Sequence, residues 1–332
     1  MNSRPVIPLL LAIPLLLTGC AREPGKDTPS GGGTRGASLP QTIVPPMVTP
    51  PTFNGTRAFG FLTAQTAFGP RSPLSSGHGQ CLAYLSATLR GLADEVRVQE
   101  FTHTGYDGEK LRLTNLVASF RPAAPARILL CAHWDTRPRA EHDEDKSRRN
   151  EPILGANDGA SGVAVLLEIA TLLKSAPPAI GVDLVLFDGE DYGKENDHAR
   201  YLLGSRHFAA NLPPGYMPRF GILLDMVGDR FLDLPREQFS VRYAPDIVDL
   251  VWKTAARLGI RQFEDGPGEE ILDDHIPLNE AGIKTIDIID FNYPDPTNRF
   301  WHSHKDIPEN CSAESLEAVG TVLTHVLYGQ IP

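Results

Sequence analysis

Two periods of hydrophobic side chains predict the elements of this chain. Near the start of the folded region, apolar positions 82, 85 and 89 mark one face of a helix, and residues 96–102 and 115–120 alternate apolar and polar side chains as β-strands do. From residue 128 on, short apolar runs alternate with longer segments of helical period. The runs and segments predict strands at 127–132, 182–187, 220–224 and 284–289, and helices at 161–173, 247–258 and 314–328.

This alternation of strands and helices predicts the fold class. Strands that alternate with helices form a largely parallel sheet with helices on both faces. Since no internal repeat and no second linker interrupts the pattern, we expect a single α/β domain with a mixed, largely parallel, twisted sheet over residues 55–332. Residues 20–54 are rich in Gly and Pro and have no sustained apolar period, which is typical of a flexible tether.

The first twenty residues have the pattern of an export signal. Arg4 precedes an apolar run, residues 7–17, that is too short to span a bilayer, and Leu17-Thr18-Gly19-Cys20 closes the segment. This ending resembles a bacterial lipobox. The resemblance implies that residues 1–19 are removed, that lipid is attached to Cys20, and that the exported protein is held at a membrane on the periplasmic or cell-surface side. An ordinary cleaved signal peptide is the alternative.

Composition excludes some partners. The chain of 332 residues is long enough for a large core, and its 31 basic against 41 acidic residues give a net charge of -10, which argues against nucleic acid or anionic lipid as the main partner.

Beyond Cys20, three cysteines remain, an odd number that rules out complete pairing within one chain. Cys131 lies in an apolar run and we expect it to be buried, whereas a bridge between Cys81 and Cys311 stays open.

Acidic and histidine side chains follow the predicted strands at their carboxyl ends, and one stands at a helix start. The residues in these positions are His133, Asp158, Glu190, Asp191, Asp225 and His302. Function collects outside the carboxyl ends of the strands of an open α/β sheet, so we expect these side chains to meet. Their types are those that bind zinc, and together they predict a catalytic metal site. Each alone has an ordinary explanation, such as a helix N-cap for Asp158.

The motifs around these residues occur in a recognisable order. They are His133-Trp134-Asp135-Thr136-Arg137-Pro138, Asn157-Asp158-Gly159, Glu190-Asp191, Leu203-Gly204-Ser205-Arg206, Leu224-Asp225-Met226-Val227-Gly228, Asp273-Asp274-His275-Ile276-Pro277 and Phe300-Trp301-His302. This order resembles the zinc aminopeptidase superfamily, in the branch of the glutaminyl cyclases, and most closely the bacterial glutaminyl cyclases of animal type. The resemblance covers roughly residues 55–330, and a shared order of motifs is more specific than any single motif.

The resemblance implies a single zinc ion held by Asp158, Asp191 and His302. Two positions depart from the family pattern. Asp191 stands where many relatives carry Glu, and we expect its shorter side chain to reach the metal from a closer backbone. Asp287 stands where the animal enzymes have a histidine, which leaves part of the proton network open.

The resemblance also implies roles around the metal. Glu190 would be the acid–base group, with Asp225 and Asp273 as its acidic partners. The residues implied for the wall of the substrate pocket are Trp301, with Tyr192 or Trp134 as further candidates. The substrate would be the N-terminus of a peptide or protein.

The implied reaction converts an N-terminal glutamine to pyroglutamate with release of ammonia. The open zinc position would take the side-chain amide oxygen, while Glu190 would take a proton from the α-amine and return it to the departing ammonia. The alternative is an exported aminopeptidase, in which His133 and Asp225 bind a second zinc bridged by Asp158. The sequence does not count the metal ions, because all five possible ligands are present. A lipid-anchored binding protein on a retired enzyme fold would have lost Glu190 or a ligand, and neither is lost.

Overall fold

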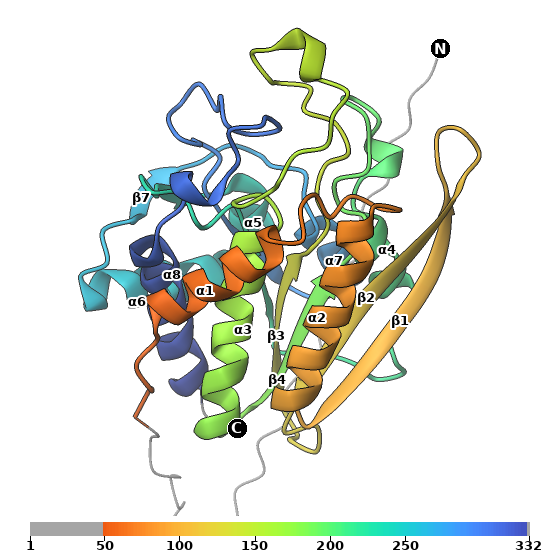
Figure 1. Ribbon diagram of the computed structural model, residues 1–332. Helices are drawn as coiled ribbons and strands as arrows, with labels where there is room; N and C mark the ends of the chain where they lie inside the picture. Colours follow the sequence, from red (N-terminus) through yellow and green to blue (C-terminus); the bar gives the residue numbers. More distant parts are fainter. Residues whose placement is uncertain (1–48, 331–332) are drawn as a thin grey trace, which may run out of the picture. The chain divides into compact units, whose positions relative to one another are not determined.

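A six-stranded mixed sheet organises residues 49–330, the part of the chain that the computed structural model describes (Figure 1). Its strands, in spatial order, are β1 (Glu95–Thr104), β2 (Lys110–Phe120), β4 (Gly181–Phe187), β3 (Arg127–His133), β5 (Gly221–Asp225) and β8 (Thr285–Ile289). The pairs β1–β2 and β2–β4 are antiparallel, and the pairs β4–β3, β3–β5 and β5–β8 are parallel. The predicted mixed, largely parallel sheet is confirmed.

Helices cover both faces of this sheet. The larger hydrophobic core lies under α1 (Gly55–Thr66), α2 (Ser76–Leu92), α3 (Ala160–Ser175), α6 (Pro245–Leu258) and α8 (Ala313–Tyr328). The opposite face packs against α4 (Leu203–Ala210) and α7 (His275–Glu280). The remaining elements are α5 (Gln238–Tyr243), the 3-10 turns η1 (Lys146–Arg148), η2 (His198–Arg200) and η3 (Pro308–Asn310), and a two-stranded parallel sheet of β6 (Leu234–Arg236) and β7 (Phe263–Pro267).

Helix α3 shows how the sequence fixes this arrangement. Its residues are apolar on nearly every side, and almost all of them are buried. Such a helix is stable only when other elements surround it. In the structure α3 packs against α1 and α8 on one side and against β3 and β5 on the other, so its first turn is fixed at the edge of the sheet.

The helices and strands that were predicted from the spacing of hydrophobic residues are confirmed. Elements that are short, or whose hydrophobic residues have no clear spacing, were missed. Helices α1, α4, α5 and α7 and strands β6 and β7 were not predicted. Phe53, in the range assigned to the tether, is buried against Gly320 of α8. The proposed signal segment and Cys20 lie outside the described residues.

The cysteines are structural. Cys81, Cys131 and Cys311 are each buried and none forms a disulfide bond, so the expectation for Cys131 is confirmed. Among the described residues, no helix has the length and apolar content that crossing a membrane requires.

Candidate metal centre and active site

The carboxyl ends of the parallel strands bring the predicted ligands together. His133 is the last residue of β3 and Asp225 the last of β5, while Asp191 follows β4 closely. Asp158 precedes α3, and His302 lies in the loop between β8 and α8. Two groups of three potential ligands form there, and in each the ligand atoms lie within 4.8 Å of one another. The groups are His133–Asp158–Asp225 and Asp158–Asp191–His302, so Asp158 belongs to both.

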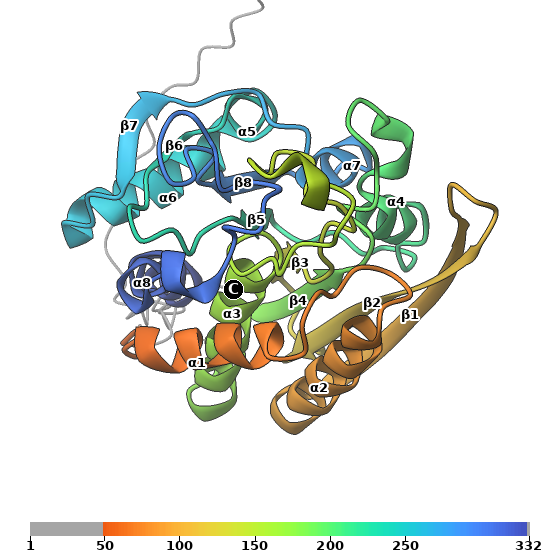
Figure 2. The same cartoon turned by 45° about the horizontal axis from the view of Figure 1, so that its top comes forward.

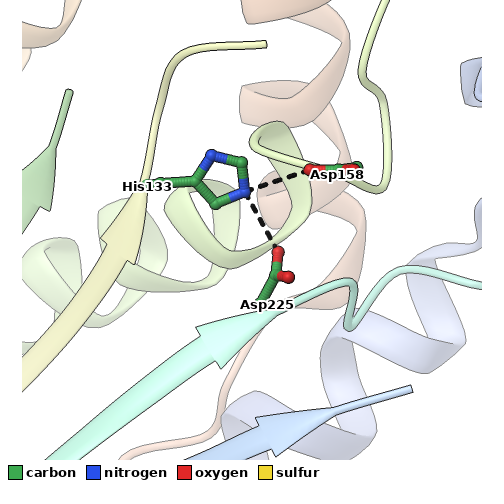
Figure 3. Close-up of side chains that lie close together, drawn as sticks. All are labelled: His133, Asp158 and Asp225. Atoms are coloured by element: carbon green, nitrogen blue, oxygen red, sulfur yellow. Dashed lines mark hydrogen bonds and ion pairs between the residues drawn. The ribbon is translucent and has the colours of Figure 1, made fainter. Parts of the chain in front are cut away.

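In the first group, a histidine lies between two carboxylates. His133 Nε2 is 3.1 Å from Asp158 Oδ1 and 3.1 Å from Asp225 Oδ1 (Figure 3). Burial by itself lowers the pKa of His133, but the nearby carboxylates of Asp135, Asp158 and Asp225 outweigh it and raise the pKa well above its usual range. The His133 imidazole thus lies between the Asp158 and Asp225 carboxylates.

The second group has the features of a metal site. His302 Nε2 lies 3.3 Å from Asp191 Oδ1 and 3.6 Å from Asp158 Oδ2, and all three side chains are buried. Asp191 Oδ2 is buried without a hydrogen-bond partner in the described structure, which is costly for a carboxylate unless a cation completes it. One imidazole and two carboxylates fit a divalent metal of the zinc type and leave a position for substrate.

The backbone of His302 supports this assignment. Its φ of 51° lies in the left-handed region, which residues with a side chain adopt rarely and at an energetic cost. Such strain persists where the surrounding structure holds the residue in place, and it is common at functional sites. The strained backbone of His302 therefore supports a functional role for its side chain beside the two carboxylates.

Arg137 holds the other oxygen of Asp191. Its Nη1 lies 2.6 Å from Asp191 Oδ1, its Nε 2.6 Å from Glu141 Oε2, and its Nη2 donates to the Tyr201 hydroxyl at 2.7 Å. Burial raises the pKa of Asp191, but the charges of His302 and Arg137 outweigh it and hold the pKa well below its usual range. The arginine therefore keeps Asp191 ionised and leaves Oδ2 free for a metal.

The turn before α3 fixes Asp158. Gly159 is the N-cap with a φ of 102°, and a Cβ there would lie 2.3 Å from the Asp135 carbonyl oxygen, so the turn requires glycine. The backbone N–H groups of Asn157 and Asp158 donate to the Asp306 carboxylate at 2.7 and 3.1 Å. The ordinary explanation of Asp158 as a side-chain helix cap is not what the structure shows.

The loop after β4 is held from two sides. The Asp135 carboxylate accepts hydrogen bonds from the backbone N–H groups of Glu190, at 3.0 Å, and Asp191, at 3.3 Å. The Asp188 carboxylate pairs with His78 Nε2 at 2.9 Å. Because the backbone is fixed in this way, the side chains of Glu190 and Asp191 reach different surroundings.

Glu190 has the surroundings of an acid–base group. Its side chain is 12% exposed, and its Oε2 lies 4.0 Å from His133 Nδ1. Burial, followed by the charge of Asp191, raises the pKa of Glu190 well above its usual range. A carboxyl group with a raised pKa is suited to take up and release a proton.

Further carboxyl groups crowd the same place. Burial, and then the charges of Asp225 and Asp274, raise the pKa of Asp273 to about 8. The Asp287 carboxyl faces Asp273, and burial followed by the charge of Asp273 raises its pKa well above its usual range. Neither oxygen of Asp287, nor Asp273 Oδ2, receives a hydrogen bond within the described residues. Because crowded carboxylates cannot all ionise, this cluster holds at least one proton.

A cavity of about 330 Å³ opens beside the second group. The residues that line it include Trp301, His302, Arg137, His142 and Phe291. The Trp301 ring stacks on the His302 ring with their centroids 3.7 Å apart. Trp301, which the resemblance implies for the wall of the substrate pocket, lines this cavity.

Trp134 and Tyr192 are not at this wall. Trp134 is fully buried, stacks on His78 and donates its indole N–H to the Thr114 carbonyl at 3.1 Å. The Tyr192 hydroxyl donates to Glu109 Oε1 at 2.6 Å, outside the cavity. Trp134 directly follows His133, the last residue of β3, and successive side chains of a strand point to opposite sides. Tyr192 directly follows Asp191 in the turn after β4.

Several residues of the site were missed from the sequence. No sequence motif marks His78 or His142, yet His78 holds the Asp188 loop and His142 packs edge-on against Trp301, with the ring centroids 4.7 Å apart. Arg137 and Asp135 lie within the motif around His133, but the sequence assigned them no role. His304, two residues after His302, pairs with the Asp143 carboxylate at 2.7 Å and belongs to neither metal group.

The fold and this site define a zinc-exopeptidase-like α/β protein. Residues 115–327 match the model of Peptidase family M28, and the chain belongs to this family. The match covers the sheet from β2 to β8 and every candidate metal ligand.

The similar solved structures and curated proteins are of two kinds, glutaminyl cyclases and aminopeptidases. The structure of Bacteroides thetaiotaomicron glutaminyl cyclase bound to N-acetylhistamine is 40% identical, with a TM-score of 0.81, over 85% of this chain and 100% of that one. A leucine aminopeptidase precursor from the same organism is also 40% identical, with a TM-score of 0.82, over 85% of this chain and 99% of that one.

Among curated proteins, the Bothrops jararaca glutaminyl-peptide cyclotransferase is 25% identical over 76% of this chain and 75% of its own length. The Bacillus subtilis aminopeptidase YwaD is 29% identical over 61% of this chain, and the match spans only 41% of the aminopeptidase.

Proposed function

We propose that this protein is a zinc-dependent glutaminyl-peptide cyclotransferase, which converts the N-terminal glutamine of peptides or proteins to pyroglutamate with release of ammonia. One observation carries the proposal. Glu190, which is not a ligand in either metal group, lies among carboxyl groups that include Asp273, whose pKa is raised by burial, and a Trp301-lined cavity adjoins the metal site. The 40% identity to a structure of a bacterial glutaminyl cyclase supports it.

The three residues Asp158, Asp191 and His302 would hold the zinc ion. The orphaned Asp191 Oδ2 and the short distances within this group support the assignment. When bound there, zinc supplies Lewis acidity that polarises the side-chain amide carbonyl of the glutamine.

The protein's own groups account for the proton transfers. The α-amine of the substrate reacts in its unprotonated form: its nitrogen forms a bond to the side-chain amide carbon and loses one proton to the ionised Glu190 carboxylate. The bond from that carbon to the amide nitrogen breaks, and Glu190 gives this proton to the nitrogen that leaves as ammonia. Atoms and charge balance without any co-reactant, since the ring closes within one substrate.

The remaining side chains orient the substrate. The Asp225 and Asp273 carboxyl groups hold the amino group in line with the amide carbon, and Trp301 packs against the glutaminyl side chain. Ring closure within one molecule needs orientation and charge stabilisation above all, which a fixed, largely buried site provides.

A two-metal aminopeptidase is the second candidate, and one observation favours it. The group His133–Asp158–Asp225 could hold a second metal bridged by Asp158, as the ligand atoms lie within 4.8 Å. In that case Glu190 would activate a water molecule instead of an amine. The similarity to aminopeptidases, including the leucine aminopeptidase precursor, supports this second candidate.

Two assays on the purified domain decide between them. A cyclase releases ammonia from glutaminyl peptides, leaves leucyl amides intact and binds one zinc per chain. Hydrolysis of leucyl amides with two zinc ions per chain would overturn the proposal.

The N-terminal pattern supports a further proposal on location. Residues 1–19 and Cys20 lie outside the described residues, so the proposal rests on the sequence alone. We propose an exported bacterial lipoprotein, anchored to the membrane through lipid on Cys20, with the residues between Cys20 and the buried Phe53 as its tether.

A further inference from the structure

A second cavity adjoins the candidate substrate cavity. It has a volume of about 320 Å³ and is lined by parts of β6, β7 and β8 and the loops beyond them. Glu269, Ile271 and Phe291 line both cavities. The two cavities therefore meet along residues 268–272. These residues belong to the segment that links β7 to α7, whose course Figure 2 shows. When the first residue of a peptide fills the candidate substrate cavity, the second cavity lies next to that peptide.

Backbone hydrogen bonds fix this boundary. The Gly268 N–H donates to the Arg236 carbonyl at 2.8 Å, and the Gln238 N–H donates to the Glu269 carbonyl at 2.9 Å. Two residues on, the Ile271 N–H donates to the buried Glu237 carboxylate at 3.1 Å. Glu269 is thus held on both sides, and its side chain is placed at the boundary of the cavities.

The charge at this boundary is not balanced. The Glu269 and Glu264 side chains are exposed, and the described residues offer neither a hydrogen bond nor an ion pair to their carboxylates. The next residue, Glu270, is paired with Arg242.

No basic side chain of the lining compensates these carboxylates. Arg137 is the one Arg or Lys among the described residues that line either cavity, and its guanidinium is occupied by Asp191, Glu141 and Tyr201. A substrate chain that leaves the first cavity past Glu269 therefore enters a negative field.

We propose that Glu269 makes this enzyme select peptides that carry Lys or Arg directly after the N-terminal glutamine. The inference rests on the proposed cyclase function, since it assumes that the glutamine fills the cavity at Trp301 and His302. The next residue then lies at the boundary where the Glu269 carboxylate has no partner of its own. A cation there gains a partner, and an acidic residue meets repulsion.

The test compares kcat/KM for two peptides that differ only in the second residue, Gln-Lys and Gln-Glu, at low ionic strength. We expect the Lys peptide to be preferred by the wild-type protein. The substitution Glu269→Gln should lower the Lys:Glu ratio about two- to fivefold, the scale of one exposed charge pair, by slowing the Lys peptide and speeding the Glu peptide. Salt should shrink the wild-type preference.

Glu100→Gln is the matched control, because Glu100 is an exposed glutamate of β1 that lines neither cavity. Its Lys:Glu ratio should equal that of the wild type. Equal cyclisation of both peptides by the wild type, or an unchanged ratio in Glu269→Gln, would overturn the inference while leaving the cyclase function standing. Failure to release ammonia from either peptide would overturn both.

Discussion

Glu190 and Asp191 are neighbours in the chain, yet the structure gives their carboxylates opposite properties. Asp191 lies between Arg137 and His302, and these positive or proton-donating groups hold its pKa low. Glu190 has only the more distant His133 Nδ1, at 4.0 Å, and burial beside Asp191 outweighs it and holds the pKa of Glu190 high. Environment therefore separates a metal ligand from a proton carrier on adjacent residues.

This separation predicts the effect of Glu190→Gln. The amide keeps the shape of the side chain but cannot accept the proton of the substrate amine, so turnover should fall by about 10²- to 10⁴-fold. Zinc content, measured on the purified protein, should stay at the wild-type value because Glu190 belongs to neither metal group. In the companion variant Asp191→Asn the zinc should be lost. Wild-type turnover by Glu190→Gln would show that another group carries the proton.

Arg137 acts on the metal through Asp191, which makes it a positioning residue. Without the guanidinium, Asp191 Oδ1 loses its 2.6 Å partner and the ligand is free to turn away. We expect Arg137→Gln to weaken zinc binding about 10- to 100-fold, as measured by competition with a chelator of known affinity. Arg148→Gln serves as control, because Arg148 is exposed and Glu151 is its one ion-pair partner among the described residues. Equal zinc affinity in the Arg137 variant and the control would contradict this role.

At the scale of elements, Glu237 connects three parts of the structure that border the site. Its carboxylate caps α5 through the N–H groups of Phe239 and Ser240 and holds the segment 268–272 through Ile271. It also lies 3.4 Å from His275 at the start of α7. Burial raises the pKa of Glu237, but these partners, His275 first among them, outweigh it and lower the pKa to about 2.

Glu237→Gln should therefore destabilise the fold by about 2 kcal/mol at neutral pH, since charged hydrogen bonds to buried partners are lost. Because the folded pKa is depressed, this stability is complete above the unfolded pKa of about 4.3 and is lost as the pH falls towards about 2. Urea unfolding of both proteins between pH 3 and pH 8 measures the difference.

Glu280→Gln, an exposed change at the end of α7, should alter the stability by about 0.5 kcal/mol or less. A difference between wild type and Glu237→Gln that grows as the pH falls would contradict the assigned sign.

The sequence predicted those elements whose hydrophobic period is long and regular. Strands β3, β4, β5 and β8 read as apolar runs because both of their faces are covered, and α3 and α8 carry a sustained helical period. Helices α5 and α7 have six residues each, less than two turns, so their period gives no signal. Their stability comes from caps and contacts such as those of Glu237, which only the folded chain brings together.

The same limit applied to the site. The five ligand candidates were predictable because strand ends collect at one edge of a parallel sheet. The partners behind them were not, since His78 reaches Asp188 across 110 positions of the chain and Asp287 faces Asp273 only through the packing of α7 on β8. Trp134 was placed wrongly because its motif lies at the site while its ring lies in the core.

At the scale of the whole molecule, the described domain is an M28 fold that supports two chemistries. Both candidate metal groups are present and share Asp158, so the fold alone does not choose between an amine and a water as nucleophile. The choice lies in the surroundings of the metal site, where the raised pKa of Asp273 near Glu190 and the cavity lined by Trp301 favour a glutaminyl amine. Function here depends on the site rather than on the fold.

The mass spectrum of a single glutaminyl peptide after incubation with the zinc-loaded protein tests this account most directly. Cyclisation and hydrolysis start from the same substrate but give products of different mass. The account predicts a product that has lost one molecule of ammonia and keeps every residue. A product that has lost its first residue, with free glutamine in solution, would contradict it.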